Sequence, residues 1–281
     1  MDSGGPQNTS GYGAGGQGAD ALANLRAEID RIDGELVNLV GERLKIAEGI
    51  AAAKTGSGLP VRPAREVQLL RRLVAQAEGK VEPDLVVEIW RALISANVRR
   101  QGPVDVVVGA GGGADPLRHF DLARRHFGAR TRISRVDAPR EALTRAAETP
   151  NLVAVVPWPN KTGAGMWWHI LTESRYHKLF IIAALPMQGP PGSEPEAAVV
   201  AANTVLEPAG EDFTIALAFD RHYKTARALQ EANLKGAEIA RADTRVLVRL
   251  DEFMAPEDPR AGLLIRAGLD QFKVVGSFAR V

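Results

Sequence analysis

The residues of this chain with the clearest chemical potential are two cations on one face of a long predicted helix. Apolar residues recur there at intervals of three and four, the pattern of a helix that packs against a partner helix. The stripe comprises Leu22, Leu25, Ile29, Ile32, Leu36, Leu39, Arg43, Ile46 and Ile50. Arg43 occupies an apolar position, and Lys54 follows within about 20° of the same face. Because a buried charge is costly unless it is paired, the pattern predicts a buried anionic ligand.

A third cation of the same helix, Arg26, lies about 25 Å from Arg43 along the axis and about 100° around it. Its side chain cannot reach a ligand held by Arg43 and Lys54 of the same chain. If two such helices pack antiparallel, each supplies its Arg26 to the other's site. The spacing therefore favours a homodimer with shared sites, provided that all three cations act together.

The composition excludes several other kinds of site. The chain has 281 residues, a net charge of +1, no cysteine and five histidines without the spacing of zinc ligands. A charge near zero gives no case for nucleic acid or an anionic membrane as a partner. The lack of cysteine removes disulfides and thiolate ligands. We therefore expect no metal and no cofactor.

The N-terminal segment is rich in Gly and has neither a basic stretch nor an apolar one. We expect residues 1–19 to form a disordered tail rather than a signal peptide. No segment reaches the roughly 18 apolar residues of a membrane span. The cytoplasm is the expected location.

Three predicted helices precede a change of pattern at Gly102 and Pro103. The helices cover residues 20–54, 63–78 and 83–101. Short apolar runs that are typical of strands follow at 104–108, 130–136, 152–156, 179–185, 213–219, 245–250 and 273–278, with helical patterns at 117–127, 225–233 and 259–269. This alternation indicates an α/β fold. The predicted domains are an all-α three-helix domain over 20–102, an α/β domain over 103–200 and a small α/β module over 207–281.

Residues 20–101 resemble the all-helical, AroQ-class chorismate mutases, which are dimeric helical bundles. The similarity rests on LxxLRxEIDxID (22–33), on Glu42–Arg43 followed by IAxxIAxxK ending at Lys54, on PVRPARE (60–66) and on a third helix ending at Gln101. The resemblance implies the rearrangement of chorismate to prephenate in the shikimate pathway of aromatic amino-acid biosynthesis. This pericyclic reaction requires no nucleophile, metal or cofactor.

The same resemblance implies how the substrate carboxylates are held. Arg43 and the partner's Arg26 would bind the two carboxylates, because the planar guanidinium bonds a carboxylate through two N–H groups. Arg65 would support the carboxylate end.

The remaining roles concern the reacting ether and the ring. Lys54 and Gln101 would hydrogen-bond the ether oxygen of the breaking bond, and Glu66 would hold the ring hydroxyl. The family has an acidic residue shortly before the Arg–Glu pair, as in PVxDPxRE, whereas this chain reads PVRPARE. Hydroxyl recognition then rests on Glu66 alone, and we expect weaker binding with the chemistry retained.

The region after residue 102 resembles a degenerate prephenate dehydratase. The strand, glycine loop and helix at 104–128 are similar to the family's GPxGTxS segment, and NLVAVVPWPN (151–160) is similar to GVVPIEN, with Pro159 in place of Glu. The TRF catalytic motif is absent, and Asp212-Phe213-Thr214 is only a permuted version. We therefore expect no dehydratase activity.

The last module resembles an ACT regulatory domain. It ends on VVGSF (274–278), where the family has VLGSY, but ARADTR (240–245) replaces the phenylalanine-sensing ESRP. A prephenate dehydrogenase is a weaker alternative for the second half, since GxGxxA at 109–114 is an unspecific signal and the remaining length is short.

Three hypotheses for the function remain open. The first is a homodimeric chorismate mutase whose degenerate tail stabilises or regulates it. The second is a bifunctional mutase and dehydratase with an unrecognised second site. The third is a non-catalytic partner that binds chorismate or an amino acid and modulates another enzyme.

Overall fold

The computed structural model describes residues 14–53, 58–111, 113–190 and 192–281. The chain divides into two compact units, Met1–Lys54 and Thr55–Val281. Lys54 and most of the predicted tail lie outside the described residues. None of the described helices is both long and apolar enough to cross a bilayer.

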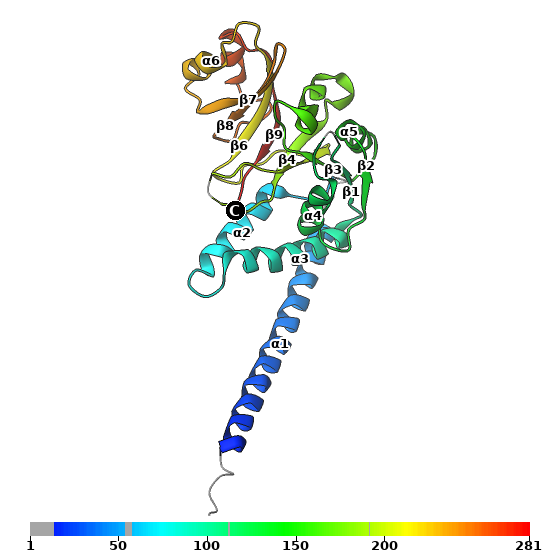
Figure 1. Cartoon of the computed structure of the whole chain (residues 1–281), viewed down its shortest axis with the longest axis vertical. Helices are drawn as coiled ribbons and strands as arrows, with labels where there is room; N and C mark the ends of the chain where they lie inside the picture. The colour runs from blue at the N-terminus through cyan, green and yellow to red at the C-terminus, as the bar shows by residue number, and fades with distance from the viewer. Residues whose placement is uncertain (1–13, 54–57, 112, 191) are drawn as a thin grey trace, which may run out of the picture. The chain divides into compact units, whose positions relative to one another are not determined.

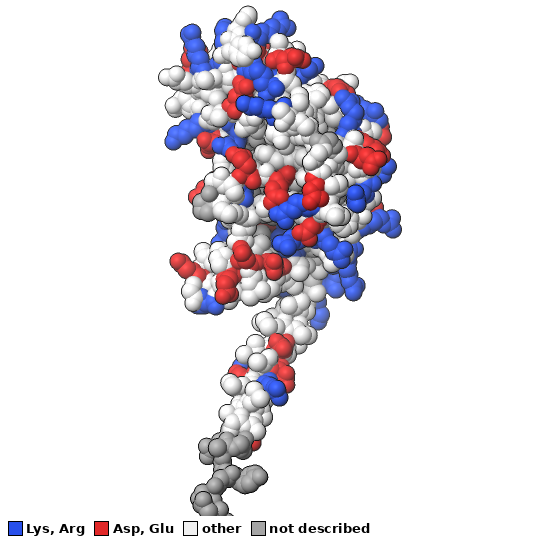
Figure 2. Space-filling model, in the orientation of Figure 1, with Lys and Arg blue, Asp and Glu red and all other residues white. Residues whose placement is uncertain are grey.

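The described part of the first unit is the helix α1 (Ala14–Ala53) (Figure 1). It begins at Ala14, so residues 14–19 of the predicted disordered tail are helical, because a helix that has nucleated extends at little cost. Its apolar stripe faces solvent, with exposed fractions between 42% and 67%. These residues are Leu22, Leu25, Ile29, Ile32, Leu36, Leu39, Ile46 and Ile50. Figure 2 accordingly shows uncharged side chains over much of the visible surface of α1.

The second unit is built on one sheet. Its described strands are β1 (Asp105–Gly109), β2 (Ile133–Val136), β3 (Leu152–Pro157), β4 (Leu179–Leu185), β5 (Ala197–Ala202), β6 (Phe213–Phe219), β7 (Gly236–Ala242), β8 (Arg245–Leu250) and β9 (Asp270–Phe278). They lie in the order β2-β1-β3-β5-β4-β9-β6-β8-β7. β1 is parallel to β2 and β3, whereas β5 is antiparallel to both of its neighbours.

The predicted dehydratase-like and ACT-like segments share this sheet. β4 pairs in parallel with β9, with Ile181 opposite Gly276. A side chain at Gly276 would approach within 2.4 Å of the Ile181 carbonyl oxygen. Glycine is therefore required for the two strands to pair this closely, and the predicted boundary near residue 200 crosses a continuous sheet.

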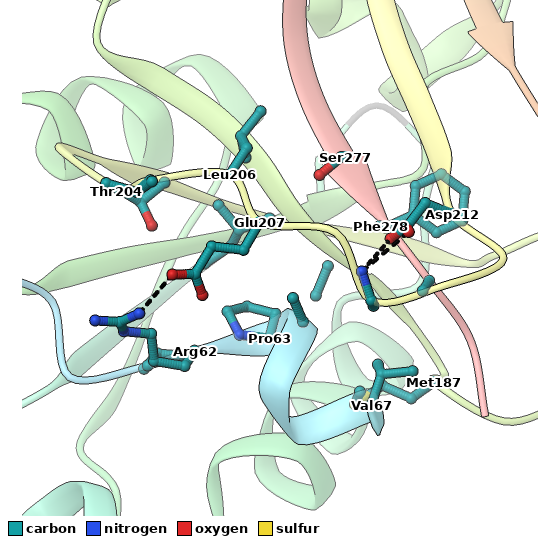
Figure 3. A pocket seen from close by; sticks show the side chains of 17 residues that line it. Arg62, Pro63, Val67, Met187, Thr204, Leu206, Glu207, Asp212, Ser277 and Phe278 are labelled. Atoms are coloured by element: carbon teal, nitrogen blue, oxygen red, sulfur yellow. Dashed lines mark hydrogen bonds and ion pairs between the residues drawn. The ribbon is translucent and has the colours of Figure 1, made fainter. Parts of the chain in front are cut away.

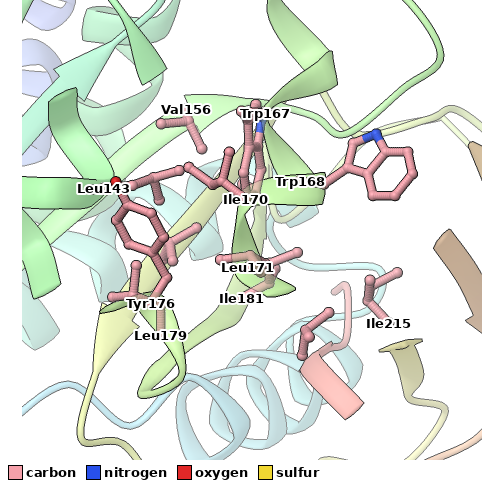
Figure 4. Packing of buried hydrophobic residues seen from close by; sticks show 14 of the residues in the cluster. Leu143, Val156, Trp167, Trp168, Ile170, Leu171, Tyr176, Leu179, Ile181 and Ile215 are labelled. Atoms are coloured by element: carbon pink, nitrogen blue, oxygen red, sulfur yellow. The ribbon is translucent and has the colours of Figure 1, made fainter. Parts of the chain in front are cut away.

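Helices cover both faces of the sheet (Figure 1). On the dehydratase-like half, α2 (Pro63–Gln76), α3 (Pro83–Gln101) and α4 (Pro116–Phe127) pack with Val106 and Val108 of β1 in one core. α5 (Pro139–Glu148) and the 3-10 segments η1 (Gly163–Thr172) and η2 (Ser174–Tyr176) share the opposite core with Val107 (Figure 4). α6 (Thr225–Glu231) and α7 (Ala261–Arg266) cover the other half of the sheet, in the predicted ACT-like segment.

The fold class is the predicted one, a helical region followed by an α/β sheet. The apolar runs at 213–219 and 245–250 coincide with β6 and β8. The sequence patterns did not identify α5, β5 or β7. The two strands are rich in alanine, which has low strand propensity, so their pairing depends on the neighbouring strands rather than on their own sequence.

Replacing Gly276 with Ala should destabilise the second unit by about 1–3 kcal/mol, the usual cost of overpacking, because β4 and β9 must separate. Urea unfolding followed by circular dichroism measures the change. Gly262→Ala is the matched control, since it lies in α7 with its nearest neighbour at 3.5 Å. Equal midpoints for the Gly276→Ala variant and the unaltered chain would show that the strand pairing is not tight.

Candidate functional site

The first turn of α2 carries one of the predicted site residues, Glu66. Pro63 begins the helix, where its missing N–H leaves no hydrogen bond unmade. Glu66 lies in the same turn and is 7% exposed, which is rare for a carboxylate. One carboxylate oxygen pairs with Arg91 of α3, and the other is 3.4 Å from the backbone nitrogen of Arg62.

Arg91 is a functional candidate that the sequence motifs did not single out. It is 8% exposed and donates to Glu66 and to the carbonyl oxygen of His126 at the end of α4. Its spacing from Val87 and Ile94 places it on the buried stripe of α3. This is the same type of signal that identified Arg43, a cation in an apolar register.

The predicted cations of α1 differ in exposure. Arg26 is exposed. Arg43 is half-buried, burial lowers its pKa, and its Nη1 has no hydrogen-bond partner among the described residues. A desolvated guanidinium nitrogen without a partner suits an anionic ligand. Lys54 lies outside the described residues.

The remaining predicted residues lie on the second unit. Arg65 is exposed on α2, and Gln101 is the half-buried last residue of α3. One turn before it, the side-chain oxygen of Asn97 is inaccessible and has no partner among the described residues. The spacing of Asn97 and Gln101 on one helix face is the signal that could have identified it. Neither compact unit alone holds all the predicted residues.

Polar contacts dock α2 onto the C-terminal half of the same unit. Arg62 pairs with Glu207 at 2.6 Å, as Figure 3 shows, and Gln68 donates to the carbonyl oxygen of Pro208 at 3.1 Å. Arg71 donates to the carbonyl oxygen of Arg280 at 2.8 Å. A cavity of only about 30 Å³ remains beside the start of α2, too small for a substrate. The second predicted mutase helix is thus an integral part of the sheet unit.

A larger cavity, of about 590 Å³, lies at the carboxyl ends of β1 and β3. Its lining includes Trp158, Asn160 and His119. The Nδ1 of His119 lies 2.8 Å from the carbonyl oxygen of Asp115, which can only accept, so Nδ1 carries the proton. The other ring nitrogen, Nε2, is buried and has no partner among the described residues. The cavity can hold a small molecule, and carboxyl strand ends are where α/β sheets bind ligands.

The permuted catalytic motif has structural roles in this unit. The carboxylate of Asp212 accepts from the backbone nitrogen of Ala209 at 2.9–3.0 Å (Figure 3) and from that of Gly210 at 2.8 Å. The hydroxyl of Thr214 donates to the carbonyl oxygen of Glu252 at 2.7 Å. Both side chains hold loops in place. Among the described residues no group of His, Asp and Glu has the arrangement of a metal site.

Comparisons with known proteins separate the two parts of the chain. A family model described as chorismate mutase type II matches residues 25–102. The chorismate mutase of Methanocaldococcus jannaschii is 31% identical over 80 residues, which cover 28% of this chain and 81% of that protein.

A longer match reaches into the sheet unit. The bifunctional chorismate mutase/prephenate dehydratase of Pseudomonas aeruginosa is 28% identical over 175 residues, or 60% of this chain. The chain spans 47% of that relative's length. The structure of prephenate dehydratase from Streptococcus mutans overlaps 63% of this chain and 100% of its own, with a TM-score of 0.43 and 13% identity. That structural similarity is too low to support an argument.

The stability of this region should depend on pH through His126. Burial, and then the nearby Arg91, hold its pKa well below the ordinary value. Below about pH 6.5 the unfolded chain binds a proton that the folded chain excludes, so stability falls as the pH falls, by up to about 1.4 kcal/mol per pH unit. Urea unfolding between pH 7 and pH 5 measures the slope.

The His126→Gln variant should show a weaker dependence of the free energy of unfolding on pH, whereas the same change at the exposed His177 should leave that dependence unchanged. Equal slopes for the unaltered chain and the His126→Gln variant would contradict a buried neutral imidazole.

Proposed function

The chain belongs, through residues 25–102, to the type II chorismate mutase family, and from this premise we propose that it rearranges chorismate to prephenate. A prephenate dehydratase-like region follows this segment. The observation that carries the proposal is the placement of the predicted site. Arg26, Arg43, Lys54, Arg65, Glu66 and Gln101 all fall inside the matched segment.

In this proposal Arg43 and the partner's Arg26 hold the two carboxylates of chorismate. The desolvation of Arg43 favours such a role, because an ion pair with a carboxylate is stronger where water is excluded. Fixing both carboxylates selects the compact conformer in which the reacting carbons meet, so part of the barrier is removed by orientation alone.

The second contribution is electrostatic. Negative charge develops on the ether oxygen as its bond to carbon breaks. Lys54 and Gln101 donate hydrogen bonds to this oxygen, and donors that are already oriented lower the barrier without reorganising. Glu66 accepts a hydrogen bond from the ring hydroxyl. No bond forms between the chain and the substrate, so no nucleophile is required.

We further propose that the active form is a dimer of this chain. The stripe of α1 leaves eight large apolar residues at least 42% exposed along one helix, and an exposed apolar stripe of this kind marks an interaction surface. A second copy presents the same stripe, and antiparallel packing of two such helices brings Arg26 of one copy to Arg43 of the other. Burial of the stripe then stabilises the dimer and completes the site.

The fate of prephenate distinguishes this proposal from a bifunctional enzyme. The Pseudomonas aeruginosa relative carries both names, but this chain lacks the TRF motif. The cavity that contains His119 is the feature that favours a second activity or a ligand site in this region. We propose the mutase alone as the enzymatic activity.

The decisive assay follows chorismate absorbance with the purified full-length protein, then phenylpyruvate with and without acid treatment. We expect chorismate loss, with phenylpyruvate formed only after acid converts the prephenate. Phenylpyruvate without acid would establish dehydratase activity. Unchanged chorismate would reject the enzyme and favour the non-catalytic binding partner.

The Arg43→Ala variant tests whether chorismate turnover takes place at the proposed site. Loss of hydrogen bonds to a carboxylate should lower kcat/KM by about 100-fold or more, equivalent to about 3 kcal/mol. Arg31→Ala is the matched control on the same helix, because Arg31 is exposed and pairs with Glu28 and Glu35. Similar activities for the two variants would remove Arg43 from the site.

Mixing two inactive variants tests the sharing of sites. An Arg26→Ala chain and a Lys54→Ala chain together rebuild one intact site per heterodimer, so random pairing should restore about one quarter of the activity. Lys54→Ala mixed with Arg43→Ala is the control, because both residues serve the same site and no intact site can form. Mass spectrometry verifies the heterodimers, and heterodimers without recovery would exclude shared sites.

A further inference from the structure

The guanidinium of Arg91 joins three helices of the second unit. It lies in the middle of α3 and is 8% exposed. Nη1 donates to Glu66 of α2, while Nε donates at 3.2 Å, and Nη2 as well, to the carbonyl oxygen of His126 in α4. The planar group thus directs one edge to a carboxylate and another to a backbone carbonyl, a fork geometry that lysine does not provide.

The carbonyl that Arg91 binds is at a helix end. α4 ends at Phe127, and the last four carbonyl oxygens of a helix have no partner within it. These oxygens carry the negative end of the helix dipole, so a cation is favourable there. The hydroxyl of Ser95, one turn along α3, is also 3.4 Å from the same oxygen.

The two helices meet too closely here for water to separate them. Gly128, which follows α4, has a φ of +88°, and a side chain there would lie 2.8 Å from Cβ of Ser95. This contact fixes the distance between the helices. The position of Arg91 is therefore set by the backbone of the dehydratase-like region.

Stability alone does not account for this pair. Removing a carboxylate and a guanidinium from water costs several kcal/mol each, and a well-packed apolar pair is often as stable. The pair does fix the orientation of the Glu66 carboxylate, because the Arg91 guanidinium that binds it is itself held by two hydrogen bonds to His126. One oxygen of Glu66 is used in this way, and among the described residues the other has only the 3.4 Å contact with the Arg62 nitrogen. That second oxygen keeps its capacity to accept.

We propose that Arg91 is a positioning residue of the mutase site, which holds one oxygen of Glu66 so that the other can accept the substrate hydroxyl. The proposal rests on the proposed function. It gives the dehydratase-like region a role in the mutase reaction, because the carbonyl of His126 anchors Arg91. The mutase site then extends beyond residue 102, into α4.

A double-mutant cycle in the full-length chain tests the proposal, using Glu66→Gln, Arg91→Met and the two together. If Arg91 acts through Glu66, each single change raises KM about 10- to 100-fold with a smaller effect on kcat, since the hydroxyl contact exists in both the ground and transition states. The double variant should then be no worse than Glu66→Gln alone. Losses that multiply would overturn the proposal.

Two further variants keep the test decisive. Arg91→Lys retains the charge and one donor, so it should fold and give a KM between those of the unaltered chain and Arg91→Met. Arg118→Met removes another arginine–glutamate pair of α4, with Glu196, and should leave KM unchanged. A rise in KM with Arg118→Met equal to that with Arg91→Met would mean that any disturbance of α4 has this effect, which would overturn the positioning role.

Assays of the unaltered chain show whether a negative result rejects the proposed function or only the positioning role of Arg91. If it neither converts nor binds chorismate, as measured by calorimetry, the proposed function fails and the inference with it. If it converts chorismate and the cycle is multiplicative, only the positioning role fails.

Discussion

A charge that is removed from water needs an opposite charge or several hydrogen-bond partners, and this constraint organises the helical part of the second unit. Arg91 meets it with the carboxylate of Glu66 and the carbonyl oxygen of His126. Three helices must keep their relative positions for all these bonds to form. Arg91, which binds the predicted hydroxyl-binding residue Glu66, is itself anchored by His126, outside the segment that matches the mutase family.

The sheet also depends on contacts between segments that are distant in the sequence. β4 and β9 pair across the predicted boundary between the dehydratase-like and ACT-like segments, and α2 binds the loops and the strand end of the C-terminal half. Segments that resemble separate modules thus share hydrogen bonds and core. The folded state of α2 and α3 therefore depends on the dehydratase-like region, with which they share a core.

In the first unit, by contrast, apolar side chains are exposed rather than packed. α1 exposes its apolar stripe and carries a half-buried arginine without a hydrogen-bond partner for Nη1 among the described residues. A helix of this kind cannot bury its apolar face by itself. The proposed dimer, with an anionic substrate between the helices, would cover the stripe and supply a partner for this Nη1.

The sequence by itself determined what depends on local pattern. The stripe of α1, the proline at the start of α2 and the apolar runs of β6 and β8 are encoded in neighbouring residues, so periodicity and spacing identified them. Arg43 was found in the same way, whereas Glu66 was identified through the resemblance of PVRPARE (60–66) to the chorismate mutases. Tertiary structure alone decided the pairing of alanine-rich β5 and β7, the joining of β4 to β9 and the partner of Glu66. These features arise between residues distant in the chain, where the burial of one group depends on the packing of another, and no local pattern records that dependence.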